Sequence, residues 1–154
     1  MSEPKAADFT GVMAAPAHLA IDEHALDAYM RGAVAGYRGP VRVEKFKGGQ
    51  SNPTYLLTTP QKKYVLRRKP PGKLLPSAHA VDREYKVMTA LHGIGFPAPK
   101  THALCEDETL IGAIFFIMDY VEGRIFWDAS LREAGRNERA PLYEALTDTL
   151  ADLH

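Results

Sequence analysis

The sequence is poor in several features, and each absence excludes a class of protein. Its single cysteine, Cys105, excludes an intramolecular disulfide and a zinc site built from several cysteines. No uninterrupted apolar run approaches the roughly 18 residues of a membrane span. The chain opens with Glu3, Lys5 and Asp8 instead of the apolar core of a signal peptide. These features predict a reduced, cytoplasmic setting and no membrane partner.

Charge of one sign is also lacking. The 154 residues include 19 Lys and Arg and 19 Asp and Glu, so the formal net charge is zero. This balance argues against a general polyanion-binding protein, although basic residues gather between Lys62 and Lys73. A solvated sheet edge explains most of that cluster, and no matching motif accompanies it, so we expect no nucleic-acid partner. The composition, 45% hydrophobic, is that of a globular chain of one domain, or of one and a fragment.

The spacing of apolar residues predicts an α+β fold. Residues 1–20 have no steady period and are expected to form an irregular arm. After them the sequence predicts a helix from 21, strands at 41–46, 54–59 and 63–68, a helix at 77–92 with Ser77 as its N-cap, strands at 101–105 and 113–121, and a helix at 141–154. Strands this close in sequence are most simply antiparallel neighbours. We therefore expect a five-stranded antiparallel sheet with one helix inserted between its third and fourth strands.

A glycine-rich segment, Gly48-Gly49-Gln50-Ser51-Asn52, separates the first two predicted strands. Adjacent glycines let a backbone approach a ligand closely, and successive N–H groups there can face phosphate oxygens. An ordinary hairpin turn uses the same residue types. The segment has neither the Walker nor the Rossmann pattern, so on these residues alone both interpretations stay open.

Arg67 and Glu84 form a second candidate feature. Val65 and Arg67 share one face of a predicted strand, which places a cation beside the glycine-rich segment, where bidentate contact suits a polyphosphate. Glu84 lies on the following predicted helix and could hold that cation, because a buried charge needs a partner. The alternative is that Arg67 belongs to a solvated basic edge and Glu84 is a surface charge.

A third feature is the apolar run 115–118, which continues through 119–122 to Gly123. A strand that ends in a short extended linker exposes backbone N–H and C=O groups, which can pair with the edge of an adenine ring. The alternative is a core strand that simply leaves the sheet.

The order of these features is that of a protein-kinase N-lobe. The residues of these segments more closely resemble the aminoglycoside phosphotransferase family, and most of all its branch of phosphotransferase domains fused to acyl-CoA dehydrogenases. The resemblance covers about residues 21–154 and is carried by Gly48–Tyr55, Tyr64–Gly72, Arg83–Tyr85 and Phe116–Gly123. It implies a kinase-like nucleotide-binding N-lobe over 21–121, then the hinge exit and the first helix of a truncated C-lobe over 122–154.

The same resemblance implies ATP as the cofactor and a set of nucleotide-binding residues, which are Gly49, Gln50, Ser51, Asn52, Val65, Arg67, Glu84, Met118, Asp119 and Val121. The glycine-rich residues would cover the phosphates. Arg67, where such kinases commonly carry Lys, would contact the α- and β-phosphates, with Glu84 holding it. Val65 would cover one face of the adenine, and Met118 would lie at the back of the pocket. The backbones of Asp119 and Val121 would pair with the adenine edge.

The catalytic residues of that family are missing from this sequence. The family transfers phosphate with a His-Gly-Asp-x-x-x-x-Asn loop and a later Asp, which also hold Mg²⁺. The asparagines here are Asn52 and Asn137, Arg132 stands five residues before the latter, and no His-Gly-Asp occurs. We therefore expect the N-terminal portion of an ATP-dependent phosphotransferase acting on a small-molecule hydroxyl, inactive alone, with Mg²⁺ ligands beyond residue 154. A non-catalytic nucleotide-binding or interaction module is the alternative.

The last predicted helix carries an apolar stripe of four leucines, at positions 142, 146, 150 and 153. In a two-lobed fold such a stripe would be buried by later sequence. We expect it either to fold back on the N-lobe or to join two copies of the chain as a homodimer.

Overall fold

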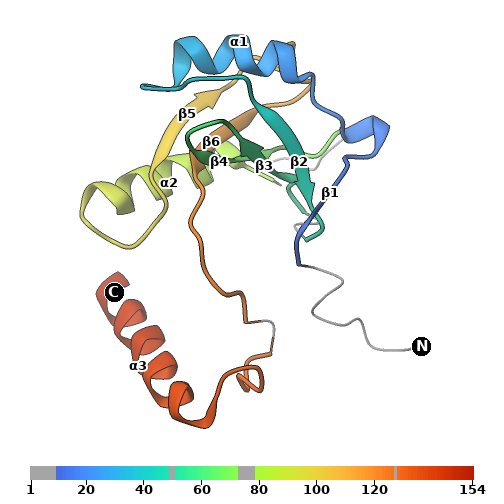
Figure 1. The fold of residues 1–154 in the computed structure, drawn as a ribbon. Helices are drawn as coiled ribbons and strands as arrows, with labels where there is room; N and C mark the ends of the chain where they lie inside the picture. Colours follow the sequence, from blue (N-terminus) through green and yellow to red (C-terminus); the bar gives the residue numbers. More distant parts are fainter. Residues whose placement is uncertain (1–9, 49–50, 73–78, 127) are drawn as a thin grey trace.

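Six antiparallel strands in one sheet organise the chain (Figure 1). The computed structural model describes residues 10–48, 51–72, 79–126 and 128–154. Within them the elements are β1 (Val12–Met13), a short 3-10 helix (Ala17–Leu19), α1 (Glu23–Ala33), β2 (Arg42–Phe46), β3 (Thr54–Thr58), β4 (Lys63–Arg68), α2 (Val81–Gly93), β5 (Thr101–Cys105), β6 (Phe115–Asp119) and α3 (Arg136–Leu153). The strand order across the sheet is β1-β2-β3-β4-β6-β5. The α+β class is confirmed. The inserted helix is confirmed too, as α2, which lies between β4 and β5 in the sequence.

The predicted number of five strands is wrong, because the segment expected to be an irregular arm supplies β1. Val12 pairs with Phe46 and Met13 with Lys45, which makes β1 an edge strand beside β2. The backbone N–H of Lys47 donates to the carbonyl of Gly11 at 3.1 Å and extends this pairing by one step. A two-residue strand is too short to leave a periodic pattern in the sequence.

α1 covers one face of the sheet. The carboxylate of Asp22 caps the helix by accepting from the backbone N–H groups of His24 and Ala25, at 2.9 and 3.1 Å. Leu26 and Met30, one turn apart, are both fully buried against the sheet. Burying side chains of this size contributes roughly 1.5–3 kcal/mol each, so this face holds the main core.

The central strands divide the sheet into a core face and an open face. In β3, Tyr55 and Leu57 are fully buried in the cluster beneath α1, while the alternate residues point to the opposite side. The ladder aligns Leu56 with Val65, and Val65 with Met118, in one row across β3, β4 and β6. A neighbouring row places Thr54 and Arg67 on the same open face.

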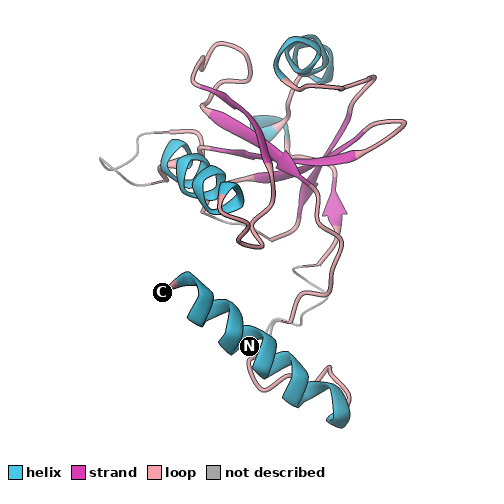
Figure 2. Cartoon of the chain, turned by 90° about the vertical axis from the view of Figure 1, so that its left-hand side faces the viewer, coloured by secondary structure: helices cyan, strands magenta, loops and turns pink. Residues whose placement is uncertain are grey.

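α2 packs on that open face, opposite α1 (Figure 2). Tyr85 meets Phe116 of β6 edge to face, with ring centroids 6.0 Å apart. The helix begins at Val81, with Ala80 as its N-cap, four residues later than predicted. Ser77, the predicted cap, lies outside the described residues. His79 precedes the helix with φ of 58°, a left-handed backbone that turns the chain into α2.

α3 stands apart from the sheet in both views (Figures 1 and 2). It begins at Arg136, five residues before the predicted start, and contains Pro141 within its length. The carboxylate of Glu138 accepts from the backbone N–H of Gly135 at 2.9 Å, which secures the first turn. The part of the chain that the structure describes contains no helix long and apolar enough to cross a membrane.

Candidate functional site

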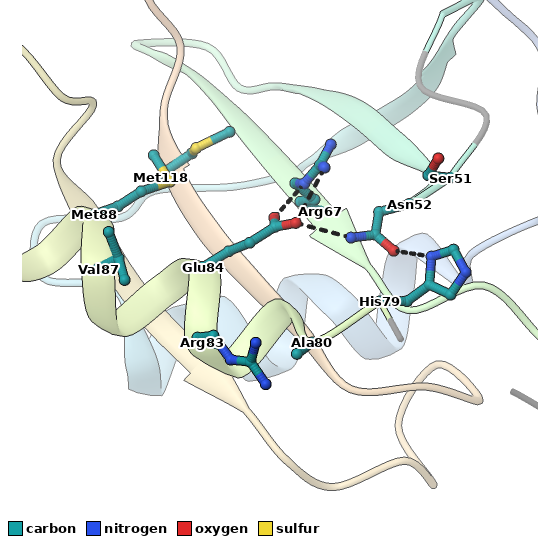
Figure 3. A pocket seen from close by; sticks show the side chains of 10 residues that line it. All are labelled: Ser51, Asn52, Arg67, His79, Ala80, Arg83, Glu84, Val87, Met88 and Met118. Atoms are coloured by element: carbon teal, nitrogen blue, oxygen red, sulfur yellow. Dashed lines mark hydrogen bonds and ion pairs between the residues drawn. The ribbon is translucent and has the colours of Figure 1, made fainter. Parts of the chain in front are cut away.

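A cavity of about 740 Å³ lies between the open face of the sheet and α2 (Figure 3). It is lined by Ser51, Asn52, Arg67, His79, Ala80, Arg83, Glu84, Val87, Met88 and Met118. Five of these were predicted from the sequence to belong to a nucleotide site, and they come from four separate stretches of chain. The fold therefore brings the glycine-rich segment, β4, α2 and β6 to one place.

Arg67 and Glu84 form a bidentate ion pair in this cavity (Figure 3). Arg67 Nε lies 2.5 Å from Glu84 Oε2, and a terminal guanidinium nitrogen lies 3.2 Å from Oε1. The other terminal nitrogen donates to the hydroxyl of Thr54 at 3.1 Å. β4 and α2 thus present opposite charges to one another, which fixes the direction of the arginine side chain.

Arg67 keeps capacity for a further ligand. A guanidinium has five N–H donors, and three are engaged by Glu84 and Thr54, so two remain. The Arg67 side chain is 29% exposed and Glu84 is 36% exposed, so an anion can reach the pair from the cavity. An oriented, partly exposed guanidinium is suited to a phosphate group.

Asn52 extends the hydrogen-bonded group from Glu84 to His79, away from Arg67. Its amide nitrogen donates to Glu84 Oε1 at 3.0 Å, and its carbonyl oxygen lies 3.0 Å from Nδ1 of His79. Since the amide oxygen can only accept, the imidazole carries its proton on Nδ1. Asn52 is 3% exposed and its backbone carbonyl accepts from the hydroxyl of Thr54, so its role here is to brace Glu84.

The opposite end of the cavity is apolar. Val87 and Met88 of α2 and Met118 of β6 gather there, as Figure 3 shows. Val65, in the same row as Met118, is 7% exposed and lies on the open face without lining this cavity. A ligand with a flat apolar part and a charged part would meet both kinds of surface.

Of the predicted site residues that the structure describes, Val65, Asp119 and Val121 do not line the cavity. Gly49 and Gln50 lie outside the described residues, so their prediction stays untested. Asp119 ends β6, and its backbone N–H donates to the carbonyl of Lys100 at 2.8 Å. Val121 lies beyond β6 with a side chain that is 65% exposed.

The carboxylate of Asp119 belongs to a separate polar cluster. Lys62 Nζ and His102 Nε2 each lie 2.6 Å from its Oδ1. Burial raises the pKa of Asp119, but the hydrogen bonds from Lys62 and His102 outweigh that effect, and the pKa is lowered. This cluster ties β5 and β6 to the turn that precedes β4.

Sequence reasoning missed His79 and Arg83. The left-handed backbone of His79 brings this residue to the cavity, and no residue pattern in the sequence predicts that conformation. Arg83 adjoins Glu84 in the sequence, and Figure 3 shows it directed away from the Arg67–Glu84 pair. The sequence shows Arg83 next to Glu84, but charged neighbours of this kind favoured a surface position for Glu84 and pointed to no role for Arg83.

Within the described ranges, no group of three or more His, Cys, Asp or Glu side chains is arranged to hold a metal ion. The carboxylate nearest the cavity, Glu84, already accepts from Arg67 and Asn52. The residues described here do not fit a Mg²⁺ site.

Comparison with known proteins identifies the class. The family model described as the phosphotransferase enzyme family (APH) matches residues 42–154. The chain therefore belongs to the phosphotransferase enzyme family.

Its relatives confirm the branch suggested by the sequence. Acyl-CoA dehydrogenase family member 11 of Rattus norvegicus is 44% identical over 137 residues, and that of Gallus gallus is 47% identical over the same length. Each alignment covers 86% of this chain and 18% of the relative, so the chain spans less than a fifth of those proteins. A crystal structure from Ralstonia eutropha, provisionally assigned as an aminoglycoside phosphotransferase, is 48% identical with a TM-score of 0.68, covering 81% of this chain and 35% of that one.

Proposed function

We propose that this chain is the nucleotide-binding part of an ATP-dependent phosphotransferase that phosphorylates a hydroxyl group of a small molecule. The observation that carries the proposal is the Arg67–Glu84 pair, held bidentate beside the glycine-rich segment in a cavity of about 740 Å³. Membership of the phosphotransferase family supports the reaction class. The choice of ATP and of a hydroxyl acceptor rests on the resemblance of the residues.

Arg67 is proposed to bind the α- and β-phosphates with its two remaining N–H donors. Glu84 holds the guanidinium in place, and Asn52 holds Glu84, so the cation is oriented before the nucleotide arrives. Preorganisation of this kind lowers the entropy lost on binding. Val65, in the row next to Arg67, would lie against the base, with Met118 behind it.

Transfer itself needs groups that the described residues do not supply. The acceptor oxygen must form a bond to the γ-phosphorus while the bond to the β-phosphate oxygen breaks, and the hydroxyl proton must pass to a carboxylate. The resemblance places that carboxylate and the Mg²⁺ ligands outside residues 1–154. We therefore assign binding and orientation of the nucleotide to this chain.

An ATP titration of the 154-residue chain tests the proposal. Arg67→Ala should weaken binding by roughly tenfold or more, because a charge-assisted bidentate contact is lost. Glu84→Gln should weaken binding less, since it frees the arginine but keeps its charge. Chemical-shift titration follows the weak affinities expected without a metal site.

Arg132→Ala is the matched control. That arginine is 82% exposed and pairs with Asp128, far along the chain from the cavity, so its removal should leave ATP affinity unchanged. Equal affinity in the wild type and Arg67→Ala would exclude Arg67 from the site and remove the observation on which the proposal rests.

A further inference from the structure

A second cavity, of about 550 Å³, lies on the same face of the sheet as the first. Thr54 and Leu56 of β3 line it, and in the ladder they stand opposite Arg67 and Val65. The hydroxyl of Thr54 accepts from Arg67 at 3.1 Å. One hydrogen bond therefore joins the wall of the second cavity to the charged group of the first, and a single elongated ligand can occupy both.

The chemistry of the second cavity suits an uncharged ring. Phe46, Leu56 and Ile125 provide apolar surface, and Tyr120 adds an aromatic side chain from the segment that follows β6. Among the described residues, no Asp, Glu, Lys, Arg or His lines it. The charged part of a nucleotide would lie at Arg67, and its base would lie on the open face across Val65 and its ladder partner Leu56, with one side in this second cavity.

The N-terminal arm forms one wall of this second cavity. Thr10, Gly11 and Val12 line it, although they are more than thirty residues from the other lining positions. The arm is held by the pairing of Val12 with Phe46 and by the bond from Lys47 N–H to Gly11 O. Gly11 has φ of 88°, a left-handed backbone that favours glycine and turns Thr10 along the end of β2.

We propose that the arm, Thr10–Val12, is a functional wall of the nucleotide site, where the side chain of Val12 contacts the base. This inference rests on the proposed function and adds to it a binding element outside residues 42–154, the range matched by the family model. It assigns to the arm the recognition of the base and not of the phosphates, because the arm faces the uncharged cavity.

The arm is also coupled to occupancy of the cavity. A two-residue edge strand has few hydrogen bonds, so it opens locally at low free-energy cost. A nucleotide that contacts Val12 binds the closed arm better than the open arm, and must therefore shift the arm toward the closed state. The amide of Lys47, which donates to Gly11, reports that shift directly.

The test compares two ligands in three proteins. ATP carries base and phosphates, while tripolyphosphate carries the charge without base or ribose. Val12→Ser keeps the backbone pairing and removes the apolar contact, and Met13→Ser makes the same kind of change one residue on, at a side chain that does not line the cavity. Val12→Ser should weaken ATP binding by about fivefold or more and leave tripolyphosphate unchanged, and Met13→Ser should affect neither.

Two results would overturn the inference while leaving the proposed function intact. One is a Val12→Ser protein that binds ATP as the wild type does or loses both ligands equally, while Arg67→Ala still weakens ATP. The other is an exchange rate of the Lys47 amide, in the wild-type chain, that ATP does not slow. If Arg67→Ala leaves ATP binding unchanged, the proposed function itself fails, and the role of the arm fails with it.

Discussion

At the scale of residues, the cavity depends on one carboxylate that serves three donors. Glu84 accepts from Nε and a terminal nitrogen of Arg67 and from the amide of Asn52. These three donors satisfy the carboxylate, so the arginine remains paired and aimed when no ligand is present. The imidazole of His79 completes the series by donating to Asn52.

Part of this arrangement follows from the sequence, and part requires the fold. Arg67 and Glu84 were predicted as partners because a cation on a strand, followed by a carboxylate on the next helix, is the order of a protein-kinase N-lobe. The contacts of Asn52 and His79 depend on the left-handed backbone at His79, which is a tertiary outcome. For the same reason Asp119 was interpreted through its backbone, while the structure engages its side chain with Lys62 and His102.

The Asp119 cluster predicts a measurable pH dependence. The pKa of Asp119 is lowered in the folded chain, so its contribution to stability is present above the unfolded pKa of about 3.9 and is lost as pH falls through the folded pKa. Asp119→Asn should reduce the free energy of unfolding by about 1–2 kcal/mol at pH 7. The deficit should shrink as pH falls below about 4, as measured by urea unfolding at a series of pH values.

Asp148→Asn is the control, since Asp148 is an exposed aspartate on α3. It should leave the unfolding free energy within about 0.5 kcal/mol of the wild type. A deficit in Asp119→Asn that stays constant from pH 7 to pH 2 would show that the ionised carboxylate does not carry the effect.

At the scale of elements, the spacing of apolar residues identified the long helices and strands and missed the short or interrupted ones. α1 and the strands β2 to β6 have apolar periods and were placed within a few residues. β1 has two residues and draws its stability from pairing with β2, which is not a local property. The start of α3 was placed at Pro141, yet the helix begins five residues earlier, where the carboxylate of Glu138 accepts from the backbone N–H of Gly135.

α3 exposes much of its apolar stripe. Leu146, Leu150 and Leu153 are 56%, 50% and 48% exposed, while Leu142 is partly covered by the segment before the helix. The helix is not packed on the sheet, which removes one of the two arrangements expected from the sequence (Figure 1). We predict that the 154-residue chain self-associates through this stripe, and that Leu146→Glu with Leu150→Glu abolishes the association in sedimentation velocity.

The control places the same two charges on a part of α3 outside the stripe. Thr147→Glu with Ala151→Glu should leave sedimentation unchanged, because at 100° per residue those positions lie about 105° and 145° around the helix from the centre of the stripe. A wild-type chain that remains monomeric over the whole concentration range, or a control pair that disrupts association equally, would contradict the prediction.

At the scale of the whole molecule, the sheet separates stability from binding. The face beneath α1 holds most of the fully buried side chains, and the face beneath α2 holds both cavities. Because different side chains of the same strands serve the two faces, substitutions at Arg67 or Val12 can change ligand affinity without removing core packing. The layout suits a lobe that binds one of the two substrates of a two-substrate reaction.

We predict that the 154-residue chain binds ATP but does not transfer its γ-phosphate. The sequence contains no His-Gly-Asp, and neither asparagine has an aspartate five residues before it. Incubation with labelled ATP, Mg²⁺ and a panel of small hydroxyl compounds should give no phosphorylated product. Stoichiometric, metal-dependent transfer to any of them would show that other residues of this chain act as the base.

The arginine at position 67 also decides which reagents can detect this site. No lysine lines either of the two cavities among the residues that the structure describes. Nucleotide reagents that acylate an amine near the phosphates would find no nucleophile here, because a guanidinium keeps its proton at neutral pH. Among the described residues of the two cavities, amine acylation would therefore label no lysine, whereas an arginine-selective dicarbonyl reagent, competed by ATP, would report Arg67.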